Sequence, residues 1–211
     1  MDKKNVSIAV VKRLPRYFRY LGDLIKNDVL KVSSNELSKK MQVTASQIRQ
    51  DLNCFGGFGQ QGYGYNVLSL YNEIGNILGA NRNYKVIIIG IGNLGNAIAN
   101  NVNFEKRGAK LIGLFDVLPS IIGTVCNNLI VNSMENLESF CNEYKPDIAV
   151  LTLPKKEAPE IFKRLIKANI KSFWNFSNME LIAPEGICVE NVHIGDSLMT
   201  LCYCIKTNEG K

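Results

Sequence analysis

The sequence predicts an α/β fold in two parts, in which a helical N-terminal part precedes a doubly wound parallel sheet. Three observations support this fold class. Near the N-terminus, apolar residues recur at steps of three and four, as they do along one face of a helix. After residue 85, β-branched runs alternate with amphipathic segments, a pattern typical of parallel strands and their crossover helices. Between the two patterns lies a tract of glycine and aromatic residues at 55–65.

The length and composition indicate a globular protein with room for two small domains. The chain has 211 residues, and no apolar run approaches the roughly 18 residues that cross a bilayer. The N-terminal segment lacks the apolar core of a signal peptide, so we expect a cytoplasmic protein. The six cysteines are scattered and His193 is the only histidine, so we expect reduced, mostly buried thiols and no metal site.

The net charge of +6 is concentrated in the first part of the chain. Residues 1–80 carry eleven Lys and Arg against six Asp and Glu, whereas residues 81–211 carry fourteen against thirteen. A basic excess in one part is expected where that part binds a polyanion such as DNA. A solvated basic face with no partner is the alternative interpretation.

Residues 14–53 are predicted to form three helices. In "LPRYFRYLGDLIKN" the apolar residues make one continuous stripe. Ser33 and Glu36 have the spacing of a capping box, which marks the start of the second helix. Thr44 and Gln47 repeat this spacing after a short turn. Two short capped helices joined in this way indicate a helix-turn-helix.

The next segment predicts the wing of a winged helix-turn-helix. Residues 55–65 alternate glycine with aromatic and amide residues, which suits a tight β-hairpin because glycine supplies positive φ at turns. Residues 67–78 are predicted to form a further helix, followed by a linker at 79–83. We expect the buried face of this helix to comprise Leu68, Tyr71, Ile74, Ile77 and Leu78.

The second part has the alternating pattern of a doubly wound parallel sheet. Buried strands are predicted at 86–89, 111–115, 148–153 and 170–176. Amphipathic segments between them predict helices at 96–105, 134–144 and 156–168.

The first of these strands ends in Gly90-x-Gly92-x-x-Gly95, the pattern of a Rossmann dinucleotide-binding turn. The first glycine permits the tight turn, the second lets the backbone approach a pyrophosphate, and the third lets helix and strand pack closely. Asp116 ends the next strand, 21 residues after Gly95. A carboxylate there would accept hydrogen bonds from ribose hydroxyls and repel a 2′-phosphate, which favours NAD+/NADH over NADP(H). A glycine turn without a ligand is the alternative.

The ligand of such a sheet lies beyond the carboxyl ends of its strands. The predicted nucleotide-binding residues are therefore those of the glycine loop, the acidic turn and the ends of two later strands: Gly90, Ile91, Gly92, Asn93, Leu94, Gly95, Asp116, Val117, Thr152, Leu153, Pro154, Asn175, Phe176 and Ser177.

The helix-turn-helix favours binding to double-stranded DNA, because the second helix of this motif enters the major groove with its N-terminal residues against the bases. Arginine can pair with guanine and glutamine with adenine, whereas Ile48 and Leu52 are expected in the core. A helical hairpin for protein contacts is the alternative. The predicted DNA-binding residues, in the helix and the wing, are Ser46, Gln47, Arg49, Gln50, Gly59, Gln60, Gln61 and Tyr63.

The sequence does not favour an enzyme. An oxidoreductase needs a proton donor or acceptor near the nicotinamide, but no Tyr-x-x-x-Lys pair occurs and a lone His193 is more often structural. The basic unit also stands where a substrate domain would be expected. An NAD-dependent oxidoreductase with an appended DNA-binding-like domain is one alternative. A DNA-binding protein whose second part serves only as a dimerisation scaffold is another.

Five motifs occur in one order along nearly the whole chain: "RLPRYFRYL", "QIRQDL-x-x-FGGFG-x-x-GYGY", "GIGNLG", "LFD" and "WNFS". Together they resemble the Rex family of redox-sensing transcriptional repressors. The resemblance implies a homodimer in which the last helix, around 197–205, is swapped into the partner subunit. It also implies binding to a palindromic operator with NAD+, and release when NADH binds, so that genes of NADH reoxidation and fermentative metabolism are expressed.

The chain departs from the family pattern at several positions. The family often has a basic residue at the positions of Gln50 and of Gln60 or Gln61, so we expect an A·T pair where basic relatives prefer G·C. Asn101 and His193 stand where some members have a tyrosine and an aspartate tied to sensing, whereas Arg19, the expected interdomain partner of that aspartate, is retained. The size of the NADH response is therefore open, and pH-dependent release through His193 is a hypothesis.

These expectations divide the chain into three segments. Residues 1–80 are predicted to form the winged-helix DNA-binding domain, and residues 81–190 the Rossmann NAD(H)-binding domain. Residues 191–211 are predicted to form a C-terminal swapped helix and tail. A repressor whose NADH sensing is altered or lost remains a further alternative.

Overall fold

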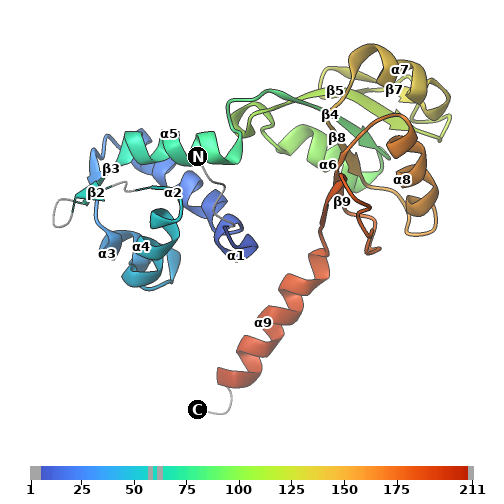
Figure 1. The fold of residues 1–211 in the computed structure, drawn as a ribbon. Coiled ribbons are helices and arrows are strands. Elements are labelled where there is room, and N and C mark those ends of the chain that lie inside the picture. Colours follow the sequence, from blue (N-terminus) through green and yellow to red (C-terminus); the bar gives the residue numbers. More distant parts are fainter. Residues whose placement is uncertain (1–5, 57–58, 61–63, 209–211) are drawn as a thin grey trace. The chain divides into compact units, whose positions relative to one another are not determined.

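The computed structural model describes residues 6–56, 59–60 and 64–208, whose helices and strands are shown in Figure 1. The chain divides into two compact units, Met1–Asn81 and Arg82–Lys211. The predicted fold class is confirmed, because the first unit is a winged helix-turn-helix and the second is a doubly wound sheet. Within the described ranges no helix is both long and apolar enough to cross a membrane.

In its described residues the N-terminal unit contains five helices and a small sheet. The helices are α1 (Ile8–Val11), α2 (Leu14–Lys26), α3 (Ser34–Met41), α4 (Ala45–Asn53) and α5 (Val67–Leu78). The strands β1 (Lys31–Val32), β2 (Gly59–Gln60) and β3 (Gly64–Asn66) pair antiparallel in the order β1-β3-β2. The predicted capping box of α3 is present, and the Thr44 hydroxyl caps α4 by accepting the N–H of Gln47. Both core predictions for α4 are confirmed, since Ile48 and Leu52 are buried.

The predicted buried face of α5 is partly wrong. Leu68 is 57% exposed and Ile77 38% exposed, whereas Val67, Leu70 and Ile74 are buried. Successive residues are rotated by about 100° around a helix, so Leu68 turns away once Val67 faces the core. The stripe that packs on α2 starts one residue earlier than the sequence pattern suggested.

The second unit is built on a seven-stranded sheet of order β10-β9-β8-β4-β5-β7-β6. This is the strand order of the Rossmann fold, in which the chain reverses direction across the sheet at β4. All pairs are parallel except the edge pair of β6 and β7. The strands are β4 (Tyr84–Ile89), β5 (Ala109–Asp116), β6 (Val125–Cys126), β7 (Leu129–Ser133), β8 (Ile148–Leu151), β9 (Ser172–Asn175) and β10 (Cys188–Asn191).

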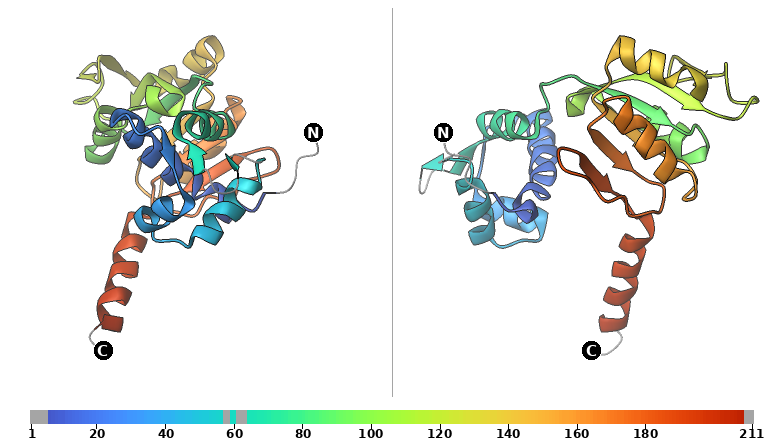
Figure 2. Two further views of the ribbon diagram at one scale, coloured as in Figure 1. Left: turned by 90° about the vertical axis from the view of Figure 1, so that its left-hand side faces the viewer. Right: turned by 45° about the vertical axis from the view of Figure 1, so that its right-hand side comes forward.

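Helices cover both faces of this sheet (Figure 2). Ile87 and Ile89 of β4 pack with α7 (Leu137–Tyr144) and α8 (Ala158–Lys167). Val86 and Ile88 pack on the other face with α6 (Asn93–Asn101). Alternate residues of a strand point to opposite faces, which explains why this run is apolar throughout. Two short 3₁₀ helices, η1 (Glu105–Arg107) and η2 (Met134–Asn136), complete the connections.

The last helix, α9 (Ile194–Asn208), has no buried residue. Its apolar side chains are largely exposed, among them Leu198 at 61% and Met199 at 72%. The expectation of mostly buried thiols is wrong. Cys126 and Cys141 are buried, but Cys188 on the edge strand β10 and two cysteines of α9 are exposed.

Candidate functional site

The predicted nucleotide loop lies at the carboxyl end of β4, where the chain direction reverses across the sheet. Gly90 follows β4 and Gly92 is the N-cap of α6, so the loop joins a central strand directly to a helix. β4 pairs with β5 on one side and with β8 on the other. Crossover connections leave such a position in opposite directions, which opens a crevice for a ligand.

Two glycines of the loop are required by close backbone packing. Gly90 has φ of +91°, and a Cβ there would lie 2.9 Å from the Thr152 carbonyl oxygen. A Cβ on Gly95 would lie 1.9 Å from the carbonyl oxygen of Gly90, which no side chain could tolerate. These contacts hold the start of α6 against the end of β4, so the motif has the packing that its spacing predicts.

Gly92 differs from its two neighbours. Its φ is −70° and a Cβ built on it meets nothing within 4 Å. Neither the fold nor backbone strain therefore demands glycine here. An open space beside the backbone is what close approach of a pyrophosphate requires.

The start of α6 provides a binding site for an anion. The Gly92 carbonyl accepts the N–H of Asn96 at 2.9 Å, as the first bond of the helix. The preceding N–H groups of Asn93, Leu94 and Gly95 have no acceptor within an α-helix. Together with the positive end of the helix dipole they favour a phosphate.

Asp116 is placed as predicted, but its carboxylate is largely engaged by the backbone. Oδ2 accepts the N–H of Ile91 at 2.6 Å, and Oδ1 accepts those of Val117 at 2.7 Å and Leu118 at 2.9 Å. A carboxylate has about four acceptor positions, so about one is left for a ribose hydroxyl. Asp116 thus ties the glycine loop to the turn after β5. Ile91 is buried and its N–H is taken, whereas Val117 is 60% exposed beside the loop.

Thr152, at the end of β8, supports the glycine loop. Its hydroxyl donates to the carbonyl oxygens of Gly90 at 2.6 Å and Ile89 at 3.0 Å. Leu153 is buried in the core, and Pro154 is exposed. The predicted residues of this strand end therefore lie beside the loop, with Thr152 as a support for it.

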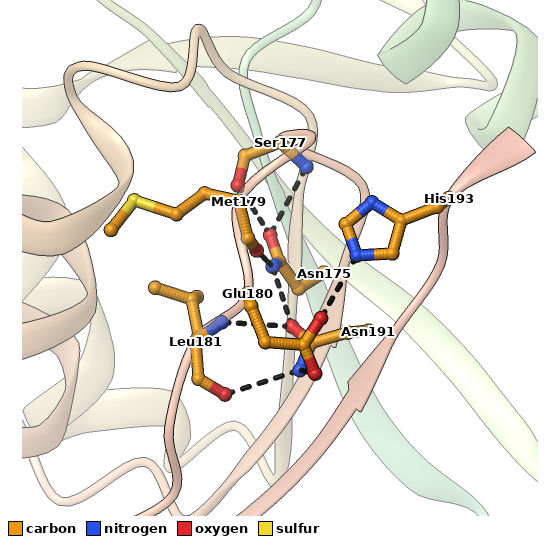
Figure 3. Close-up of polar contacts among 7 residues, drawn as sticks. All are labelled: Asn175, Ser177, Met179, Glu180, Leu181, Asn191 and His193. Carbon is orange, nitrogen blue, oxygen red and sulfur yellow. Dashed lines mark hydrogen bonds and ion pairs between the residues drawn. The ribbon is translucent and has the colours of Figure 1, made fainter. Parts of the chain in front are cut away.

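Asn175 and Ser177 hold the loop after β9 (Figure 3), and their predicted place on the nicotinamide side stays a prediction. The Asn175 amide nitrogen donates to the Met179 carbonyl oxygen at 2.6 Å and to Asn191 Oδ1 at 2.8 Å. Its oxygen accepts the N–H and the hydroxyl of Ser177 at 3.1 and 2.7 Å. All four hydrogen-bonding positions of this amide are occupied. The half-buried Phe176 packs edge-on against Trp174, with ring centroids 4.8 Å apart.

This network continues to the residue that precedes α9 (Figure 3). Asn191 donates to Glu180 Oε1 at 3.1 Å and to the Leu181 carbonyl oxygen at 3.1 Å. Glu180 Oε2 lies 3.0 Å from His193 Nε2. A chain of polar contacts thus joins the end of β9 to the start of α9.

The three predicted switch residues have separate surroundings. His193 contacts Glu180, as described, and the Asn101 amide donates to the Ala97 carbonyl oxygen of its own helix at 2.9 Å. Arg19 is exposed on α2 of the other unit. Their role in sensing stays a prediction.

The predicted DNA-reading helix is α4, whose exposed residues include Ser46, Arg49 and Gln50. Gln47 is half-buried, and Arg49 donates to the Ser34 hydroxyl of α3 at 3.0 Å. In the wing, β2 brings Gly59 and Gln60 into a hairpin with β3. The predictions for Gln61 and Tyr63 lie outside the described residues.

One polar cluster of this helix was missed by sequence reasoning. Asp51 of α4 is completely buried and bonded to Arg13 at the start of α2. A signal was available, because Asp51 follows Ile48 by three residues and so shares its buried face.

Two units with these features define a class of protein, in which a winged helix-turn-helix and a Rossmann unit occur in one chain. Family models agree: one described as "CoA binding domain" matches residues 81–179, and one described as "Putative DNA-binding protein N-terminus" matches residues 5–53.

Relatives and solved structures identify the family. The redox-sensing transcriptional repressor Rex of Thermoanaerobacter sp. (strain X514) is 53% identical over 99% of this chain and 94% of its own. The crystal structure of RSP with β-NAD+ and operator DNA has a TM-score of 0.90 at 53% identity, covering 98% of this chain and 95% of that one. RSP with β-NADH also gives 0.90, at 49% identity, covering 98% and 97%. This chain belongs to the Rex family of redox-sensing transcriptional repressors, which speaks against the oxidoreductase alternative.

Proposed function

We propose that this protein is a redox-sensing transcriptional repressor that binds a palindromic operator and is released from it when NADH replaces NAD+. One observation carries the proposal. The same chain contains a loop at Gly90–Gly95 with free N–H groups for a phosphate and a helix, α4, with exposed polar residues. Solved relatives have been crystallised with NAD+ and operator DNA and with NADH. The genes controlled would be those of NADH reoxidation and fermentative metabolism, and the protein would act in the cytoplasm.

In this proposal NAD+ and NADH are effectors and not substrates. The polar side chains predicted to face the nicotinamide are already engaged within the chain: Thr152 with the glycine loop, and Asn175 and Ser177 with each other. NADH regulates only if it binds the DNA-free form better than the DNA-bound form.

The proposed sensor path within the second unit is the polar network of Figure 3. Its members join the end of β9, where the nicotinamide would lie, to His193 and the start of α9. A ligand that alters the loop at Asn175–Ser177 would therefore alter the position of α9. This offers a route within the second unit, from the nucleotide to α9, that uses His193 where some relatives have an aspartate.

The proposed partner of α9 is a second copy of this chain, with the helix swapped between subunits. The side chains of Leu198, Met199, Leu201 and Tyr203 are all more than half exposed. Contiguous apolar surface of this kind marks a protein interface. A palindromic operator also requires two recognition helices related by a twofold axis.

The experiment that tests the proposal is operator binding by the purified protein. Fluorescence anisotropy on a palindromic A·T-rich duplex is measured at fixed salt while NAD+ or NADH is titrated. Loss of binding with NADH alone supports the proposal, whereas tight binding that is indifferent to both nucleotides contradicts the sensor. Gly92→Ala is the matched control, because it should keep DNA binding and lose the response to NADH. Turnover of a hydroxy or carbonyl substrate would contradict the assignment as an effector.

A further inference from the structure

Asp51 lies in the interior of the N-terminal unit, on the inner face of α4, with no exposed surface. Four donors surround its carboxylate. Arg13 donates through Nε at 2.6 Å and Nη2 at 2.7 Å, the Tyr17 hydroxyl at 2.9 Å, and the Gln47 amide nitrogen at 2.9 Å. A buried carboxylate is unfavourable unless it is paired and hydrogen-bonded. Here its acceptor positions are filled from two helices and from the residue before α2.

These contacts keep Asp51 ionised. Burial by itself raises the pKa of a carboxyl group, but the hydrogen bonds from Arg13, Gln47 and Tyr17 outweigh it, and the pKa of Asp51 is lowered. Burial and the hydrogen bond to Asp51 both raise the pKa of Tyr17, so its hydroxyl keeps the proton that it donates. An ionised carboxylate is an acceptor only.

The charge on Asp51 determines which way the Gln47 amide faces. Only the NH₂ group of an amide can donate to a carboxylate, so the nitrogen of Gln47 must face inward and the oxygen must lie on the other side. The backbone of Gln47 is anchored as well, because its N–H donates to the Thr44 hydroxyl at 3.1 Å. Gln47 is thereby held at both its backbone and its amide, in the first turn of α4.

We propose that Asp51 is the positioning residue of the DNA-reading helix, fixing the amide of Gln47 so that this side chain recognises adenine at one base pair of each half-site. One amide hydrogen is used by Asp51. The proposal requires that this be the hydrogen trans to the amide oxygen, because the oxygen and the hydrogen cis to it form the edge that pairs with N6 and N7 of adenine. The inference rests on the proposed function, because it names the base that the same helix recognises.

Gln50 offers an internal comparison on the same helix. It is exposed, and the four donors to Asp51 come from other residues. Its amide can rotate freely about its last bond. Removing the carboxylate at 51 should therefore change what Gln47 recognises and leave the contribution of Gln50 intact.

The test is a scan of the operator, in which every base pair of a half-site is replaced in turn and binding is measured by anisotropy at fixed salt. The proteins are the full-length chain and its single variants Gln47→Met, Gln50→Met and Asp51→Asn. Two double variants combine Asp51→Asn with each of the glutamine substitutions. We expect the unaltered protein to prefer A·T by about 5- to 150-fold at the position where Gln47→Met abolishes discrimination. Asp51→Asn should abolish discrimination at that same position, and adding Gln47→Met should change nothing further. Asp51→Asn and Gln50→Met should act additively.

A second measurement avoids any risk that the Asp51→Asn variant fails to fold. In the unaltered protein labelled with ¹⁵N, the side-chain NH₂ of Gln47 should exchange with water about tenfold more slowly than that of Gln50, as expected for a hydrogen bond to a charged group. Equal exchange rates, or an Asp51→Asn variant that keeps the preference at the Gln47 position or weakens every position alike, would overturn the inference. Absence of operator binding by the unaltered protein would overturn the proposed function itself, so the two failures are distinguishable.

Discussion

Alanine at Gly92 and alanine at Gly95 should impair nucleotide binding for different reasons, and comparing them tests how the loop works. A Cβ at position 95 would lie 1.9 Å from the Gly90 carbonyl oxygen, about 1.5 Å closer than the ordinary contact limit of 3.4 Å. The start of α6 must move away from β4 to admit it. A Cβ at position 92 meets nothing within 4 Å, and the φ of −70° suits alanine.

The magnitudes follow from these distances. Forcing an extra carbon into a packed site costs about 1–3 kcal/mol, so Gly95→Ala should lower the Tm of the second unit by several degrees. Gly92→Ala should change the free energy of unfolding by less than about 0.5 kcal/mol, as surface substitutions do. Both should weaken NADH binding by about tenfold or more, equivalent to at least about 1.4 kcal/mol. In Gly92→Ala the loss comes only from the methyl group in the path of the pyrophosphate.

The assay combines two measurements on the full-length protein. NADH affinity is obtained by fluorescence titration, and stability by thermal unfolding followed by circular dichroism. The expected pattern is a weak binder of normal stability for Gly92→Ala and a weak binder of reduced stability for Gly95→Ala. Unaltered NADH affinity in Gly92→Ala, or equal loss of stability in both variants, would refute the assignment of separate roles to the two glycines.

Two further predictions concern the DNA-reading helix. Because the pKa of Asp51 is lowered on folding, its contribution to stability is present above the unfolded value of about 3.9 and is lost as the pH falls through the folded value. Urea unfolding should therefore show Asp51→Asn about 3 kcal/mol less stable at pH 7, with the gap closing below about pH 4; a gap independent of pH contradicts this. Gln50→Lys should move the preferred operator base pair from A·T toward G·C in competition binding at fixed salt, and equal affinity of the unaltered protein for both versions would count against the role of Gln50.

The central strands and the loop were predictable because each depends on local sequence. Val86–Ile89 is apolar throughout because helices cover both faces of β4, and the glycine spacing reflects the close approach of Gly95 to the Gly90 carbonyl oxygen five residues earlier. The strand β7 and the edge strands β6 and β10 were missed. Two residues of β10 are exposed and its sequence is Cys-Val-Glu-Asn, so it carries neither a long apolar run nor a clear alternation. Edge strands are stabilised by hydrogen bonds to a neighbouring strand, and the sequence of the edge strand alone does not reveal that neighbour.

The burial of Asp51 could be predicted from its spacing to Ile48, but the partners of Asp51 and Asn175 could not, because Arg13 and Asn191 lie far away along the chain. Asn175 is the last residue of β9, a position that favours a ligand contact, and its amide is bonded to Met179, Ser177 and Asn191, the last of these 16 residues away. Asp51 is paired with Arg13, 38 residues earlier in the chain. A polar residue at a strand end or on a helix is read as solvent- or ligand-facing until the partner that satisfies it is known.

The exposure of α9 bears on how cellular abundance affects regulation. In the proposed dimer the apolar side chains of α9 are covered only when two chains associate, so the population of this dimer depends on total protein concentration by mass action. At low copy number, dissociation would empty the operator just as NADH does. The number of molecules per cell would then act as a second input beside the nucleotide ratio, and the cell could set the threshold of derepression through the rate at which it makes this protein.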